Sequence, residues 1–217
     1  MTAIFAYHGE QFVTMCGDGR VWDLFKNAIV RDSYPKIHLL PLKNLKLSIG
    51  TAGHVKVFEP CVQEMMESFD GQNWTLTDVL KRMDEITVKH MKLTIEKTKE
   101  KQSISLAILE RLFNFPSPSL ELNVQYLIGG NLAGQTFLYR FDYRNMKKTI
   151  ETIPIGTVSY IGTNREAVKP SLISLAHKLQ NCQCPDCCEE LLAKTIEQMG
   201  KAEKMIGGTI QTMTITS

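Results

Sequence analysis

The order of hydrophobic and polar positions predicts strands at the start of the chain and helices after them. Short apolar or alternating runs, separated by turn residues, predict strands over residues 2–8, 11–16, 36–40 and 46–51. Apolar residues then recur every three or four positions. This spacing predicts an amphipathic helix over residues 54–69, although Pro60 lies inside it, and a second, longer helix that begins after Thr75.

The second half of the chain repeats this order of strands followed by helices. Strands are predicted over residues 122–128, 135–142, 148–153, 157–161 and 209–216, with the first two joined by a turn at Gly129-Gly130-Asn131. Helices are predicted over residues 167–179 and 189–204. Two stacked antiparallel sheets, each covered by a helix pair, satisfy this order. The sequence therefore predicts an α+β fold, a four-layer αββα sandwich, as a single domain over residues 1–217.

Composition and charge narrow the class of protein. The 217 residues, 43% of them hydrophobic, are enough to bury the core of one large domain. The formal net charge is only +2 and the basic residues form no stripe, so we expect no nucleic-acid partner. No apolar run is long enough to cross a membrane, and no signal peptide is evident. We therefore expect a cytoplasmic protein without a membrane partner, in a compartment that keeps its six cysteines reduced.

Thr2 stands directly behind the initiator methionine and opens the first predicted strand. Removal of Met1 would give Thr2 a free α-amine. A hydroxyl next to such an amine is a minimal catalyst, because the oxygen attacks and the amine takes its proton. The alternative is a solvated hydroxyl near the terminus without a chemical role.

Further motifs follow Thr2 in order. They are Cys16-Gly17-Asp18-Gly19-Arg20, Tyr34-Pro35-Lys36-Ile37-His38, Ile49-Gly50-Thr51-Ala52-Gly53, Tyr160-Ile161-Gly162-Thr163 and Ile206-Gly207-Gly208-Thr209-Ile210. In this order and spacing the chain resembles, over nearly its whole length, the proteasome β-subunit and HslV-type family of N-terminal nucleophile (Ntn) hydrolases. The resemblance implies the same sandwich fold.

The resemblance also implies a threonine protease that cleaves peptide or protein amides through an ester on Thr2. Lys36 would lower the pKa of the Thr2 amine or hydroxyl, and Asp18 would hold Lys36. The N–H of Gly53 would stabilise the oxyanion. Taken singly, Asp18 is also a common turn residue, Lys36 a common edge charge and Gly53 a common helix-start glycine.

Three supporting positions depart from the family pattern. Thr163 stands where the family has Ser and retains a hydroxyl, whereas Glu203 stands for Asp and is one methylene longer. Ile206 stands for a second Ser and has no polar atom. The resemblance implies no required cofactor, a homo-oligomeric ring whose sites line an interior chamber, and an ATPase as a further partner.

The segment Cys182-Gln183-Cys184-Pro185-Asp186-Cys187-Cys188 is not explained by the resemblance. Four thiols within seven residues could supply three or four zinc ligands, from Cys182, Cys184, Cys187 and Cys188. The alternatives are a loop with free thiols or cysteine pairs prone to oxidation.

Three functions therefore stay open. The first is a threonine-type peptidase. The second is a non-catalytic protein that keeps the fold for assembly or binding, with the cysteine segment as its metal or redox site. The third is an N-terminal nucleophile hydrolase of small amides. Whether Met1 is removed separates the catalytic functions from the second.

Overall fold

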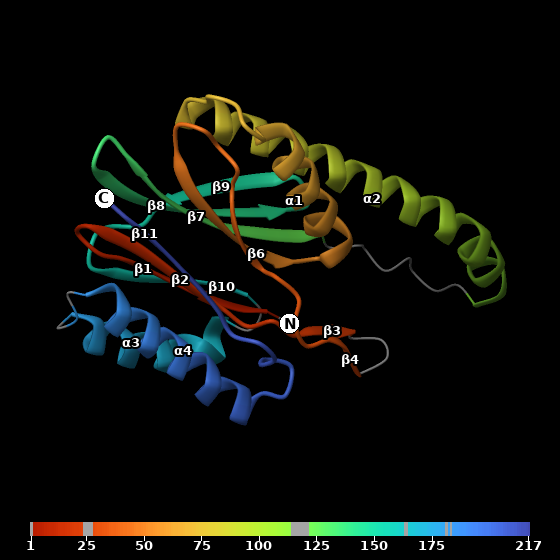
Figure 1. The fold of residues 1–217 in the computed structure, drawn as a ribbon. Coiled ribbons are helices and arrows are strands. Elements are labelled where there is room, and N and C mark those ends of the chain that lie inside the picture. The colour runs from red at the N-terminus through yellow and green to blue at the C-terminus, as the bar shows by residue number, and fades with distance from the viewer. Residues whose placement is uncertain (1, 24–27, 114–121, 163–164, 181, 183) are drawn as a thin grey trace.

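A computed structural model describes residues 2–23, 28–113, 122–162, 165–180, 182 and 184–217 (Figure 1). The predicted site residue Thr163 lies outside the described residues.

The first sheet has four antiparallel strands in the order β10-β1-β2-β11. They are β1 (Ala3–His8), β2 (Phe12–Gly17), β10 (Thr157–Gly162) and β11 (Gln211–Thr216). Ala3 pairs with Gly162, and Ile4 pairs with Gly17. Every residue of β1 and β2 is buried, because other layers cover both faces of these central strands.

The second sheet has five antiparallel strands in the order β5-β6-β7-β8-β9. They are β5 (Ile37–Leu39), β6 (Lys46–Gly53), β7 (Asn123–Leu132), β8 (Gln135–Arg144) and β9 (Lys147–Thr152). A separate two-stranded hairpin, β3 (Val21–Asp23) and β4 (Ala28–Arg31), stands beside the two sheets (Figure 1).

Two helix pairs cover the outer faces of the sheets (Figure 1). Helices α1 (Val55–Phe69) and α2 (Leu76–Phe113) lie on the five-stranded sheet, and α3 (Arg165–Leu179) and α4 (Pro185–Ala202) lie on the four-stranded sheet. A third apolar cluster, which includes Ile4 and Leu127, fills the space between the sheets. The predicted four-layer αββα sandwich is confirmed. Among the described residues, no helix is both long and apolar enough to cross a membrane.

Helix α1 continues through Pro60. A proline removes the hydrogen bond to the carbonyl four residues earlier, which here belongs to the exposed Lys56, where water can replace it. The buried face of the helix, which includes Val57, Cys61 and Met65, stabilises it across this defect.

The turn predicted at Gly129-Gly130-Asn131 is wrong, because β7 runs through these residues and the chain turns at Ala133 and Gly134. A Cβ on Gly129 would lie 2.6 Å from Cγ1 of Val13 and 2.9 Å from Cε of Met15. The glycine therefore lets β7 approach the opposite sheet closely. In this chain, glycines mark a packing contact as well as turns.

We expect Gly129→Ala to destabilise the protein by about 1–3 kcal/mol, the usual range for overpacking a core. The same substitution should cost less in a Val13→Ala background, where the nearest clashing methyl group is gone. Urea unfolding of the wild type, the two single variants and the double variant measures this coupling. Additive costs would contradict a clash between the two side chains.

Candidate active site

Asp18 lies directly after β2 and is completely buried. Its Oδ1 accepts hydrogen bonds from the Ala3 N–H at 2.7 Å and from Lys36 Nζ at 2.9 Å. Its Oδ2 accepts one from the Gly207 N–H at 3.4 Å. One carboxylate therefore joins the first strand, the segment before β5 and the loop before β11.

Lys36 lies directly before β5, and its side chain is 1% exposed. Besides Asp18, Nζ donates to the carbonyl oxygen of Arg20 at 2.6 Å. Burial lowers the pKa of Lys36, and the Asp18 carboxylate opposes this effect without cancelling it. The buried lysine is therefore easier to deprotonate than a solvated one.

The backbone of Lys36 is held on both sides. Its N–H donates to Oε1 of Gln211 at 2.9 Å, and its carbonyl accepts the N–H of Thr51 at 2.8 Å. The amide nitrogen of Gln211 in turn donates to the carbonyl of Tyr34 at 3.1 Å. The ammonium group is thus placed by β6 and β11 as well as by its own segment.

Thr2 is buried at the start of β1, one peptide unit from the N–H that Asp18 accepts. Its carbonyl accepts the Tyr160 hydroxyl at 3.4 Å. Gly162, with φ of 145°, packs against the same carbonyl so closely that a Cβ there would lie 2.0 Å from it. The structure therefore brings Asp18 and Lys36 to the residue that directly follows Thr2.

Gly53 is the exposed last residue of β6 and has φ of 112°. A Cβ on this residue would lie 2.1 Å from the carbonyl oxygen of Asn123, so the position requires glycine. Thr51, two residues earlier, is hydrogen-bonded to the Lys36 carbonyl. Gly53 thus ends the strand that lies beside Lys36, and its oxyanion role stays a prediction.

Glu203 caps the C-terminus of α4, where its N–H donates to the Met199 carbonyl. Its Oε1 accepts the N–H of Met205 at 3.4 Å, within its own turn. The loop reaches Asp18 through the N–H of Gly207 instead. Ile206 is buried in the apolar cluster under α3 and α4. The site role of Glu203, like that of Thr163, stays a prediction.

Arg20 is a supporting residue whose partners the sequence did not indicate. Its guanidinium donates to both carboxylate oxygens of Asp32, at 2.6 and 3.3 Å, and to the carbonyl of Lys204 at 2.6 Å. Gly207 packs against the guanidinium, where a Cβ would lie 3.3 Å away. Arg20 therefore fixes the loop whose N–H bonds to Asp18.

The predicted metal ligands lie elsewhere, between α3 and α4. Cys182 and Cys187 form a disulfide, and Cys184 is free and exposed. Cys188 is free and buried.

Solved structures share this fold at low sequence identity. Anbu (ancestral beta-subunit) from Yersinia bercovieri matches with a TM-score of 0.65 and 14% identity, over 99% of this chain and 81% of that one. An Anbu (Gly-1) mutant from Hyphomicrobium sp. strain MC1 matches with a TM-score of 0.59 and 15% identity, over 98% and 80%. No protein-family model and no curated protein sequence matches this chain. The likeness shows a proteasome-like Ntn-hydrolase fold and nothing beyond the fold.

These neighbours correct the family resemblance drawn from the sequence. The motifs resemble proteasome β-subunits and HslV-type proteases, whereas these solved structures are Anbu proteins, which are related to that family but distinct from it. The assignment to the proteasome β and HslV-type family was wrong. Its motifs are strand ends and glycine-containing turns, so they follow the geometry of the fold and do not separate the families that share it.

Asp18→Asn should destabilise the protein by about 3–5 kcal/mol, because it leaves the buried Lys36 ammonium without its counter-charge. The matched control is Asp32→Asn, which also weakens a bond to a cation. Because Asp32 is 51% exposed, its loss should cost only about 0.2–1 kcal/mol.

Urea unfolding measures both costs, and Lys36→Met added to Asp18→Asn should recover part of the loss. Equal costs for the two Asp→Asn variants would show that the buried ion pair does not govern stability.

Proposed function

We propose that this chain is a threonine-type N-terminal nucleophile hydrolase that cleaves peptide or protein amide bonds with Thr2 once Met1 is removed. The observation that supports the proposal is the buried Asp18–Lys36 pair, which is hydrogen-bonded to the residue directly after Thr2. A buried ion pair costs free energy unless hydrogen bonds satisfy its charges, and strongly perturbed buried charges are frequent at functional sites.

The reaction has two steps. The Thr2 hydroxyl oxygen attacks the substrate carbonyl, the free α-amine takes the hydroxyl proton, and this proton passes to the departing amine as the amide bond breaks. Water then attacks the resulting ester, which releases the acid and restores Thr2. The Lys36 ammonium favours the neutral form of the α-amine by opposing a second positive charge.

The remaining predicted residues serve the oxyanion and its support. The N–H of Gly53 donates to the oxyanion, an interaction worth about 2.7–4 kcal/mol where such a donor has been removed. Supporting roles are also proposed for Thr163 and for Glu203, which is the C-cap of α4. All bond changes use groups of the chain, the substrate and water, so the proposed reaction needs no cofactor.

A second candidate is a non-catalytic member of the fold. Ile206 favours it, because this side chain is 3% exposed and packs among apolar residues where a polar supporting group is expected. Its N–H donates to the Glu203 carbonyl, so the turn is held without a polar side chain.

The experiment combines intact mass with covalent labelling. Protein from its native host should lack Met1, and an electrophile that joins the hydroxyl and the amine of one residue should modify it once. Thr2→Ala should abolish labelling, and Thr2→Ser should retain it. Thr14→Ala is the control, because Thr14 is also buried in the four-stranded sheet. Full retention of Met1, or unchanged labelling of Thr2→Ala, would support the non-catalytic candidate.

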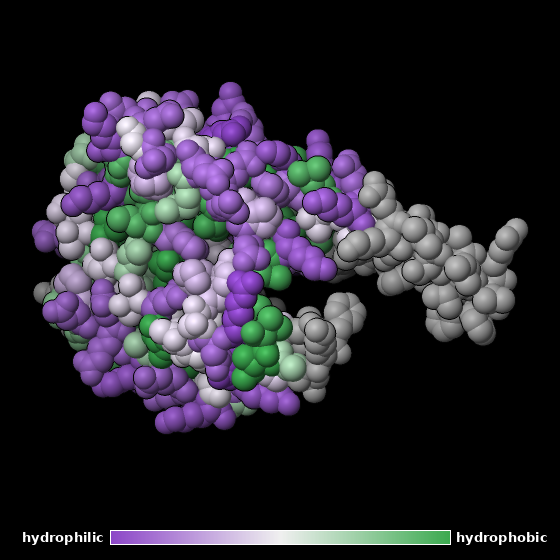
Figure 2. All heavy atoms as spheres, turned by 45° about the vertical axis from the view of Figure 1, so that its right-hand side comes forward, coloured by the Kyte–Doolittle hydropathy of each residue, from purple (hydrophilic) through white to green (hydrophobic). Residues whose placement is uncertain are grey.

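We extend the proposal to a homo-oligomer, for which Anbu, an ancestral beta-subunit, gives a precedent in the fold. All four residues of β4 are exposed, including Ile29 and Val30 at 47% and 56%. Figure 2 shows hydrophobic side chains in patches among hydrophilic ones on one face of the molecule. An exposed strand with adjacent apolar side chains favours pairing with another chain. A ring and an ATPase partner stay predictions.

Light scattering after size exclusion should give a molar mass of at least twice the 24.6 kDa of one chain. Ile29→Asp should shift it towards the monomer. Ile150→Asp is the control, because Ile150 is 54% exposed but lies on β9, in the five-stranded sheet. A monomeric wild type would overturn the homo-oligomer without affecting the catalytic proposal.

A further inference from the structure

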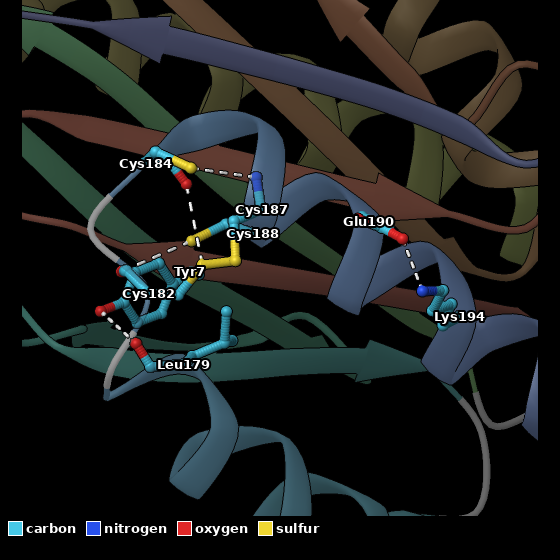
Figure 3. Close-up of a disulfide and its surroundings, with 8 residues drawn as sticks. All are labelled: Tyr7, Leu179, Cys182, Cys184, Cys187, Cys188, Glu190 and Lys194. Carbon is cyan, nitrogen blue, oxygen red and sulfur yellow. Dashed lines mark hydrogen bonds and ion pairs between the residues drawn. A yellow bond between two sulfur atoms is a disulfide. The ribbon is translucent and has the colours of Figure 1, made fainter.

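The segment between α3 and α4 brings three sulfur atoms together (Figure 3). Cys182 follows α3, Cys184 precedes α4, and Cys187 lies in the first turn of α4. Their Sγ atoms all lie within 4.8 Å of one another. Sulfurs in a tetrahedral zinc site are about 3.8 Å apart, given a Zn–S bond of about 2.3 Å. Small side-chain movements would therefore bring the three sulfur atoms to the spacing of a zinc site.

The start of α4 holds the sulfur atom of Cys184 in place. This residue is the N-cap of the helix, and its Sγ accepts the N–H of Cys187 at 3.3 Å (Figure 3). Hydrogen bonds of this kind also orient ligands around a bound metal.

Cys188 does not belong to the group. Its Sγ is buried and donates to the Cys182 carbonyl at 3.8 Å. Cys188 instead packs with Leu192 in the apolar cluster under α4.

We propose that the reduced segment binds one Zn²⁺ ion through the Sγ atoms of Cys182, Cys184 and Cys187. Thiolates select Zn²⁺ over the hard ions Mg²⁺ and Ca²⁺. A surface cavity of about 580 Å³, lined in part by Cys182 and Pro185, adjoins the site and gives water access to the fourth position.

The disulfide between Cys182 and Cys187 competes with the metal. Two equivalents of a thiol reductant convert it to two thiols and are themselves oxidised to a disulfide. Zn²⁺ then replaces the protons of three thiols, so binding releases three protons and weakens as the pH falls. The oxidised segment keeps only one of the three ligands and does not hold the ion.

The test uses the full chain, reduced without oxygen and freed of metal, with Zn²⁺ titrated against a chromophoric chelator. We expect one equivalent bound by the reduced protein and none by the oxidised protein. Co²⁺ in place of Zn²⁺ should show thiolate-to-metal charge-transfer absorption. Less than one equivalent bound by the reduced wild type would overturn the site.

Two variants test the ligand set. Cys184→Ser should lose stoichiometric binding yet preserve the helix start, because serine is a preferred N-cap. Cys188→Ala is the matched control from the same segment and should still bind one equivalent. Circular dichroism checks that both variants are folded. Unchanged binding by Cys184→Ser, or loss of binding by Cys188→Ala, would overturn the three-ligand site.

Discussion

The buried ion pair between Lys36 and Asp18 is the constraint on which the rest of this structure depends. Both side chains are almost fully removed from water, which costs several kcal/mol per ion unless other groups compensate. The compensation comes from the N–H groups of Ala3 and Gly207 and from the carbonyl of Arg20. These donors and acceptors belong to segments far apart in the chain. Stabilising this pair therefore requires β1, β2, β5 and the loop before β11 to meet at one point.

The sandwich supplies that meeting point. Four segments can surround one carboxylate only if β5, in one sheet, packs face to face with the sheet that contains β1 and β2. The close approach depends on small residues, because a Cβ on Gly17 would contact Ile4 and Ile37, and one on Gly129 would clash with Val13. The apolar cluster between the sheets and the polar site at its end are thus two parts of one interface.

The sequence predicted the layers and part of the site for physical reasons that also explain its errors. Hydrophobic periodicity indicates which face of a helix or strand is buried and so predicts the elements. The order of the predicted strands and helices then predicted the sandwich. Asp18 and Lys36 were proposed from the resemblance of their motifs to a known family, and the structure shows that they form a buried ion pair. The hydrogen bonds from Arg20 to Asp32 and from Lys36 to Gln211 join residues that no local pattern connects. Gly129 was misread because a glycine that permits close packing has the same sequence signal as one in a turn.

The position of the cysteine segment separates the proposed zinc site from the proposed nucleophile Thr2. Strand β1 has Thr2 at one end, and near its other end the hydroxyl of Tyr7 donates to the carbonyl of Leu179, three residues before Cys182. The N-terminus and the α3–α4 connection accordingly lie on opposite sides of the sandwich (Figure 1). The Asp18 site depends on contacts between the sheets, whereas the cysteine site depends on the start of one helix. The cysteine site can therefore be lost while the fold and the Asp18 site remain.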